Sequence, residues 1–94
     1  MVKILISRQF KEGHYKEITA LLADLRRSAV NQEGYVSGLT LVAHDDPQKR
    51  LVISTWQDME AWQAWRNSRD RENFDSMLEL YQEGSTDYAE YELG

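Results

Sequence analysis

Residues 35–56, YVSGLTLVAHDDPQKRLVISTW, decide the fold because they read as two strands joined by a turn. Residues 35–43 are rich in β-branched and aromatic side chains, which favour a strand. Gly38 within them indicates a bulge or a close backbone approach. The Asp-Pro sequence predicts a loop over residues 44–49. Residues 50–56 return as the second strand, so the whole stretch is predicted to form an antiparallel hairpin.

The segment before the hairpin has the spacing of an amphipathic helix. Its apolar residues recur at intervals of three and four, which predicts one buried stripe: Tyr15, Ile18, Leu22, Leu25 and Ala29. A turn at Gly13 precedes this helix, and residues 31–34 end it, with Gly34 suited to a left-handed conformation. An alternating apolar pattern over residues 2–9 predicts a further strand at the start of the chain.

The segment after the hairpin predicts a helix in two pieces. The first piece is expected to begin at Gln57 or Asp58, and Ser68 has the character of a second N-cap. The second piece is predicted to bury an apolar stripe and to end near Gly84: Phe74, Met77, Leu78 and Tyr81. Residues 86–93 alternate again and predict a last strand.

These elements follow the order β-α-β-β-α-β, which is the ferredoxin-like arrangement of an α+β domain with an antiparallel sheet. No linker or repeat divides the chain, so residues 1–94 are expected to form one domain. Helices cover one face of such a sheet, and the other face here keeps large apolar side chains. A second copy could cover that face, so we expect a homodimer.

The composition excludes several classes of function. The chain has no Cys and only two His, so neither a thiol nucleophile nor a metal site is expected. A net charge of −5 argues against nucleic acid and anionic membranes as partners. No apolar run has the length of a signal peptide or a membrane span, so a cytoplasmic location is expected.

Residues 54–69, STWQDMEAWQAWRNSR, give the chain a family resemblance. A strand that ends in Trp, a polar helix start, spaced aromatic residues and a break at Ser resemble the antibiotic biosynthesis monooxygenase (ABM) domains. Residues 33–38 resemble the glycine-marked entry into that family's second strand, and residues 44–47 resemble the acidic hairpin that follows. The resemblance implies a dimeric α/β barrel with one pocket per protomer, between the sheet and the helices.

The family resemblance implies two activities, cofactor-independent oxygenation of flat phenolic molecules and haem degradation. The haem-degrading members use an Asn on the first strand, a Trp on the helix and a His about ten residues later. Trp65 matches the Trp, but Ser7 and Asp75 occupy the other two positions. Asp is a poor replacement for a neutral imidazole at haem iron, so haem degradation is not expected. No cofactor is expected.

Trp56 and Trp65 are the candidate pocket walls, because indoles can stack on a flat aromatic substrate and donate an N–H to its oxyanion. Arg66 and Arg69 lie one helical turn apart and could hold a phenolate or carboxylate. Ser7 is included only because it aligns with a family site position. Each also has a plain structural interpretation, as a core aromatic, a solvated charge or a strand residue.

His14 and Asp75 are the candidate bases. His14 has an ordinary pKa near neutrality, and burial would raise the pKa of Asp75 far enough to accept a phenolic proton. Surface positions would explain both equally well. Three functions remain open from sequence: a monooxygenase acting on a small phenolic or quinol-like molecule, a non-catalytic binding or stress-response dimer, and a dimerisation module without a pocket.

Overall fold

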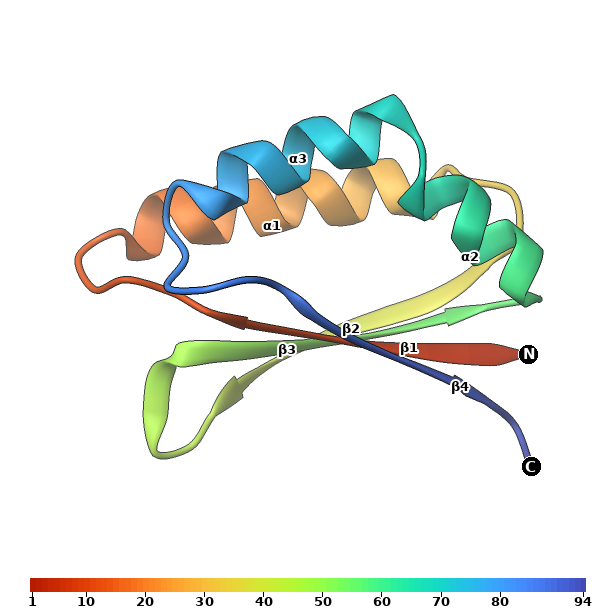
Figure 1. Cartoon of the computed structure of the whole chain (residues 1–94), viewed down its shortest axis with the longest axis horizontal. Coiled ribbons are helices and arrows are strands. Elements are labelled where there is room, and N and C mark those ends of the chain that lie inside the picture. The colour runs from red at the N-terminus through yellow and green to blue at the C-terminus, as the bar shows by residue number, and fades with distance from the viewer.

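The computed structural model describes residues 1–94, and its elements follow the predicted order (Figure 1). They are β1 (Val2–Gln9), α1 (Tyr15–Val30), β2 (Tyr35–Ala43), β3 (Asp46–Trp56), α2 (Met59–Arg66), α3 (Arg69–Glu79) and β4 (Asp87–Glu92). The second helical region is divided into α2 and α3, as the sequence predicts. The chain is therefore an α+β protein with ferredoxin-like topology.

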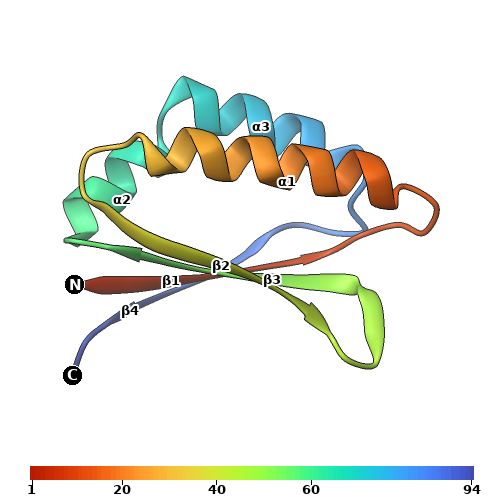
Figure 2. The same ribbon diagram turned by 180° about the vertical axis from the view of Figure 1, so that it is seen from behind.

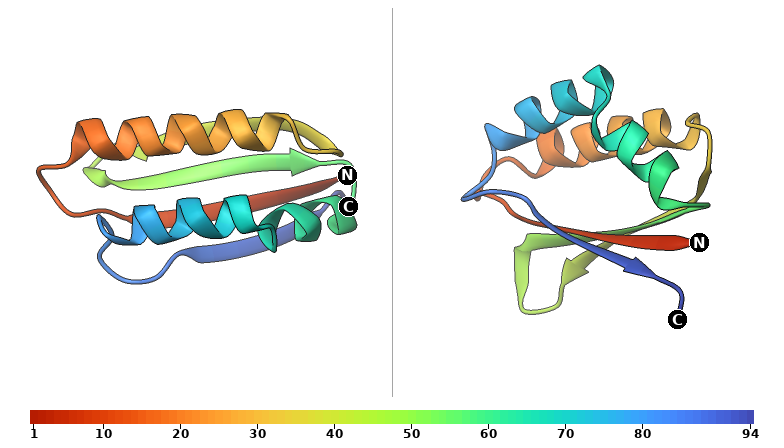
Figure 3. Two further views of the ribbon diagram at one scale, coloured as in Figure 1. Left: turned by 90° about the horizontal axis from the view of Figure 1, so that it is seen from above. Right: turned by 45° about the vertical axis from the view of Figure 1, so that its right-hand side comes forward.

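The four strands form one sheet in the order β2-β3-β1-β4, and every neighbouring pair is antiparallel. All three helices lie on one face of this sheet, and the opposite face is uncovered (Figures 1 and 2). Seen from above, α1 and the α2–α3 pair run side by side across the sheet (Figure 3). The space between these helices and the two central strands is where the protein builds its core.

The hairpin is correct in outline, but its loop is shorter than predicted. Only His44 and Asp45 form the turn, and β3 begins at Asp46 instead of residue 50. Residues 46–49 are held by β1, because the Phe10 N–H donates to the Gln48 carbonyl at 2.8 Å and Gln9 pairs with Lys49. The Asp-Pro sequence predicts the turn but does not reveal that a third strand extends the pairing.

The close approach predicted at Gly38 is present. A Cβ at this position would lie 2.6 Å from the Tyr35 hydroxyl, and a register shift in β2 separates Tyr35 from Ser37. Gly34 ends the connection from α1 to β2 and has φ +85°. A Cβ there would lie 2.5 Å from the Cβ of Ala61 in α2. Glycine at these two places lets β2 start beneath α2.

Helix α1 buries four of its five predicted stripe residues: Ile18, Leu22, Leu25 and Ala29. Tyr15 is the exception, with 71% of its surface exposed. Its ring lies in the first turn of the helix, where the guanidinium of Arg50 stacks over it at 5.1 Å. Helical spacing placed Tyr15 on the stripe, but the helix begins beyond the edge of the core.

Both predicted helix N-caps are present. Asp58 Oδ1 accepts a hydrogen bond from the Ala61 N–H at 2.8 Å, and Ser68 Oγ accepts one from the Arg71 N–H at 3.2 Å. The stripe predicted for the following helix is only partly correct. Leu78 is fully buried, but Met77 is 40% exposed, and Arg71 occupies the inner face instead.

The core is a cluster of twelve buried apolar residues contributed by the strands and all three helices. Its members are Val2, Ile4, Ile6, Phe10, Ile18, Leu22, Leu25, Ala29, Trp56, Trp62, Trp65 and Leu78. None of the helices has the length and the apolar character needed to cross a membrane.

Candidate functional site

A pocket opens between the helix-covered face of the sheet and helix α1. The cavity volume is about 50 Å³, below the range of small-molecule sites, so a bound molecule would also occupy the open mouth of the pocket. Val52 and Ser54 of β3 and Thr40 of β2 form part of its floor, and Leu22 and Leu25 of α1 form one wall. Ten of its sixteen lining residues are hydrophobic, so the site suits an apolar or aromatic molecule.

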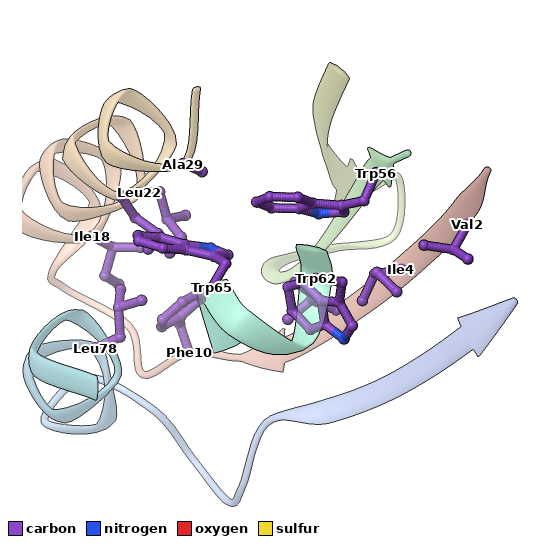
Figure 4. Packing of buried hydrophobic residues seen from close by; sticks show 12 residues of the cluster. Val2, Ile4, Phe10, Ile18, Leu22, Ala29, Trp56, Trp62, Trp65 and Leu78 are labelled. Atoms are coloured by element: carbon purple, nitrogen blue, oxygen red, sulfur yellow. The ribbon is translucent and has the colours of Figure 1, made fainter. Parts of the chain in front are cut away.

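All three tryptophans line this pocket and are almost completely buried (Figure 4). Trp56 ends β3, and Trp62 and Trp65 lie one turn apart on α2. The Trp56 and Trp62 rings are tilted at 54° with their centroids 6.0 Å apart, and Tyr35 packs edge-on against Trp56. Flat rings on several sides of one apolar cavity are well suited to hold a flat ligand.

The three indole N–H groups differ in what they can donate to. The Trp56 N–H donates to Ser54 Oγ at 3.2 Å, and the Trp62 N–H donates to Glu90 Oε2 at 2.6 Å. The Trp65 N–H forms no hydrogen bond within the chain, and its ring edge points toward the space between Trp65 and the other two indoles (Figure 4). Trp65 is therefore the indole with a donor available to a bound molecule.

Two buried arginines supply the charge of the pocket. Arg8 of β1 is 2% exposed and Arg71 of α3 is 1% exposed, and both line the cavity. They share one carboxylate, because Asp75 Oδ1 lies 3.1 Å from Arg71 Nε and 3.6 Å from Arg8 Nη2. Arg71 also donates to the Tyr88 hydroxyl at 3.0 Å. Two cations against one anion leave this end of the pocket positive.

Arg8 is the less satisfied of the two arginines. Its Nε and Nη2 are buried without any hydrogen-bond partner. Burial, followed by repulsion from Arg71, lowers the pKa of the Arg8 guanidinium, and Asp75 and Tyr88 only partly offset this effect. A buried cation with unmet donors is costly to the fold, and such a group usually has a functional explanation.

Of the residues predicted to bind substrate, the structure places Trp56 and Trp65 in the pocket and the other three outside it. Arg66 stacks on the Tyr88 ring at 4.2 Å and lies 3.6 Å from Glu90, so it rests against β4. Arg69 is exposed at the start of α3. Ser7 points to the uncovered face of the sheet, because it alternates with the buried Ile6 and Arg8.

The two candidate bases do not line the pocket and lie in different places. His14 precedes α1, where its ring packs against Tyr81 with the centroids 5.0 Å apart. Asp75 is partly exposed and lies outside the lining of the cavity, where it accepts a hydrogen bond from Arg71 and lies close to Arg8. Asp75 therefore reaches the pocket only through these arginines, and no Asp, Glu or His side chain lines the cavity.

Sequence reasoning missed Arg8 and Arg71, although a signal for each is present. Arg8 continues the buried parity of Val2, Ile4 and Ile6 along β1. Arg71 lies seven residues before the buried Leu78, on the same face of α3. Neither arginine was given a role from the sequence, because charged side chains are rarely buried without a partner.

The family model described as antibiotic biosynthesis monooxygenase matches residues 1–76. No curated protein gives a significant match. Similar solved structures include an antibiotic biosynthesis monooxygenase (TM-score 0.90, 14% identity, covering 100% of this chain and 99% of that chain). Others are a conserved protein from Methanosarcina mazei Go1 (0.92, 15%, 99% and 92%) and SnoaB from Streptomyces nogalater, a cofactor-independent oxygenase (0.85, 15%, 99% and 93%). At such identities these structures show a common fold.

Proposed function

The chain belongs to the antibiotic biosynthesis monooxygenase family, and we propose that it is a cofactor-independent monooxygenase for a small, flat phenolic or quinol-like molecule. The observation that carries this proposal is the unpartnered N–H of Trp65 in an apolar pocket walled by three indoles. Structural similarity to SnoaB supports the same class of reaction. The fold alone would not, because one fold hosts many functions.

The proposed reaction needs little from the protein. A phenol loses its proton, the carbon para to the oxyanion attacks O2, and the resulting hydroperoxide loses water to leave a quinone carbonyl. One oxygen atom enters the product and the other leaves as water, with the substrate supplying all the electrons. The Trp65 N–H would stabilise the oxyanion, and the positive charge of Arg8 and Arg71 would favour the ionised phenol.

We consider two residues as the base that takes the phenolic proton. Asp75 is the better placed, since it touches the two arginines that line the pocket, whereas His14 packs on Tyr81 outside it. No carboxylate or imidazole lines the cavity itself. We therefore propose that the phenolic proton leaves to solvent at the pocket mouth, and that Asp75 compensates part of the positive charge of the two arginines.

Oxygen uptake by the purified protein tests the proposal, using hydroquinones and anthrone-like phenols in EDTA without added flavin or metal. Uptake should exceed substrate autoxidation. Trp65→Phe keeps the ring and removes the free N–H, so kcat should fall by about 10²-fold. Trp56→Phe is the matched control, because its N–H is already bonded to Ser54 and its loss should cost far less.

One observation favours the second candidate function, a non-catalytic aromatic-ligand-binding protein. No Asp, Glu or His lines the pocket, whose titratable lining residues are Tyr35 and three arginines. This alternative predicts that the same phenols bind, measured by quenching of tryptophan fluorescence, without any oxygen consumption. Oxygen uptake above autoxidation in the wild type would exclude it.

We also propose that the protein assembles as a homodimer through the uncovered face of its sheet. Strand pairing places Leu39, Ile53, Leu5 and Ala89 in one row across this face. Leu39 is 53% exposed and Leu41 is 41% exposed, which is costly for side chains of this size. Sedimentation analysis should show a dimer, and Leu41→Lys, at a position outside the pocket, should shift it to the monomer.

A further inference from the structure

Arg8 is a buried side chain that the fold leaves incomplete. The β1 alternation points it into the helix-covered side, where it is 2% exposed and lines the pocket. Its Nε and Nη2 have no hydrogen-bond partner, and the nearest acidic atom, Asp75 Oδ1, is 3.6 Å from Nη2. Buried donors of this kind are expected to find an acceptor, and within the chain Arg8 has only the Asp75 carboxylate, which it shares with Arg71.

The charges around Arg8 point to the sign of the missing partner. Arg71 Nε donates to Asp75 at 3.1 Å, so the single negative charge of Asp75 is already paired with Arg71 and compensates Arg8 only in part. The third charged lining residue, Arg26 of α1, is also a cation, and no acidic side chain lines the cavity. In a chain with a net charge of −5, this concentration of arginine favours an anionic ligand.

The geometry of the unmet donors points to the class of anion. Nε–H and Nη2–H lie on one edge of the planar guanidinium and point in parallel, which matches the two oxygens of a carboxylate. A carboxylate is ionised throughout the neutral range, so it can neutralise a desolvated cation without a prior proton transfer. A neutral hydroxyl could accept hydrogen bonds from the guanidinium but would leave its positive charge uncompensated.

We propose that the flat aromatic ligand of this pocket carries a carboxylate, and that Arg8 is the cation that binds it. Arg8 is then the residue that selects for carboxylate-bearing substrates, while the Trp65 N–H remains available to the phenolic oxygen. This inference rests on the proposed function, because it names the substrate class of the same pocket. It assigns Arg8 to ligand binding in addition to the effect of its charge on the phenol.

Calorimetric titration of the full chain with two matched ligands tests the inference. 2-Naphthoic acid and 2-naphthamide have the same flat body and nearly the same shape, but only the first is anionic at pH 7. We expect the acid to bind at least about 10-fold more tightly, as a charge-assisted bidentate pair should give. Arg8→Met should bring the ratio of the two affinities close to one, and Arg8→Lys should keep only part of the preference for the acid.

Arg69→Met is the control variant, because it removes one positive charge from an exposed position outside the pocket. It should keep the full preference for the acid. Thermal unfolding of each variant shows whether it is folded, and Arg8→Gln provides a second substitution if Arg8→Met is not. A loss of preference shared by Arg8→Met and Arg69→Met would indicate long-range charge and overturn the assignment to Arg8.

Two further outcomes would overturn the inference. Equal affinities for the acid and the amide, including no binding of either, would show that Arg8 does not select a carboxylate. Tighter binding of 2-naphthol at a pH where it is ionised would identify a phenolate as the anion instead. Oxygen uptake is measured separately, so a binding protein without turnover would fail the proposed monooxygenase activity and still support the Arg8 site.

Discussion

The contact between Gly34 and Ala61 gives a sharp test of how the pocket wall is positioned. Gly34 has φ +85°, and a Cβ built on it would lie 2.5 Å from the Ala61 Cβ. An L-residue in this conformation costs about 1–2 kcal/mol. Carbon atoms pack at about 3.5–4.0 Å, so the neighbours must also separate by about 1 Å or more, and overpacking of this kind costs about 1–3 kcal/mol.

Gly34→Ala should therefore lower the free energy of unfolding by about 2–5 kcal/mol, the sum of these two costs. Urea unfolding followed by tryptophan fluorescence measures this change, because all three indoles lie in or beside the affected region. Gly13→Ala is the matched control. Gly13 has nearly the same φ, +90°, but its Cβ would meet nothing within 4 Å, so only the conformational cost applies.

A double-mutant cycle isolates the contact itself. Ala61→Gly alone should cost about 1 kcal/mol, because glycine is unfavourable within a helix. In the presence of Gly34→Ala, the same substitution should instead recover about 1–3 kcal/mol of packing strain. If Gly34→Ala costs no more than Gly13→Ala, or if the two substitutions simply add, then α2 does not press on the start of β2 and our account of the pocket wall is wrong.

The remaining predictions concern the charge cluster and a helix cap, all measured by urea unfolding. Arg8→Met should raise the free energy of unfolding by about 1–3 kcal/mol, because it replaces a buried cation with unmet donors by an apolar chain of similar length. Unchanged or lower stability would contradict this. Asp75→Asn should lower it by about 2 kcal/mol or more, since Arg8 and Arg71 would lose their shared anion. Ser68→Ala should cost about 1 kcal/mol through loss of the α3 N-cap, and Ser76→Ala, on an exposed position of the same helix, should cost much less.

The order of elements could be read from the sequence because it depends on local patterns. Alternation over residues 2–9, the three-and-four spacing before Ala29 and the caps at Asp58 and Ser68 each record a periodicity that the backbone imposes on its own side chains. Two residues with the predicted spacing are exposed: Tyr15 lies at the very start of α1, and Met77 lies beside the fully buried Leu78 but faces away from the core.

The pocket could be predicted only in part. Trp56 and Trp65 follow from their place in the 54–69 block, and both line the cavity. His14 was a candidate base because an imidazole ordinarily titrates near neutrality, and Asp75 because it aligns with a family site position, yet they pack on different partners, Tyr81 and Arg71. The chemistry of a site depends on which side chains are in contact, and sequence spacing does not predict contacts between separate helices and strands.

The sequence by itself determined the elements, their order and most of the buried apolar faces, because each of these follows from the periodicity of a helix or strand. Only the tertiary structure decided that Arg8 and Arg71 lie inside, that they share one carboxylate, and that two Arg8 donors have no partner. Burial of a charge is tolerable or costly according to its neighbours, and those neighbours come from β1, α3 and β4, which are distant in the chain.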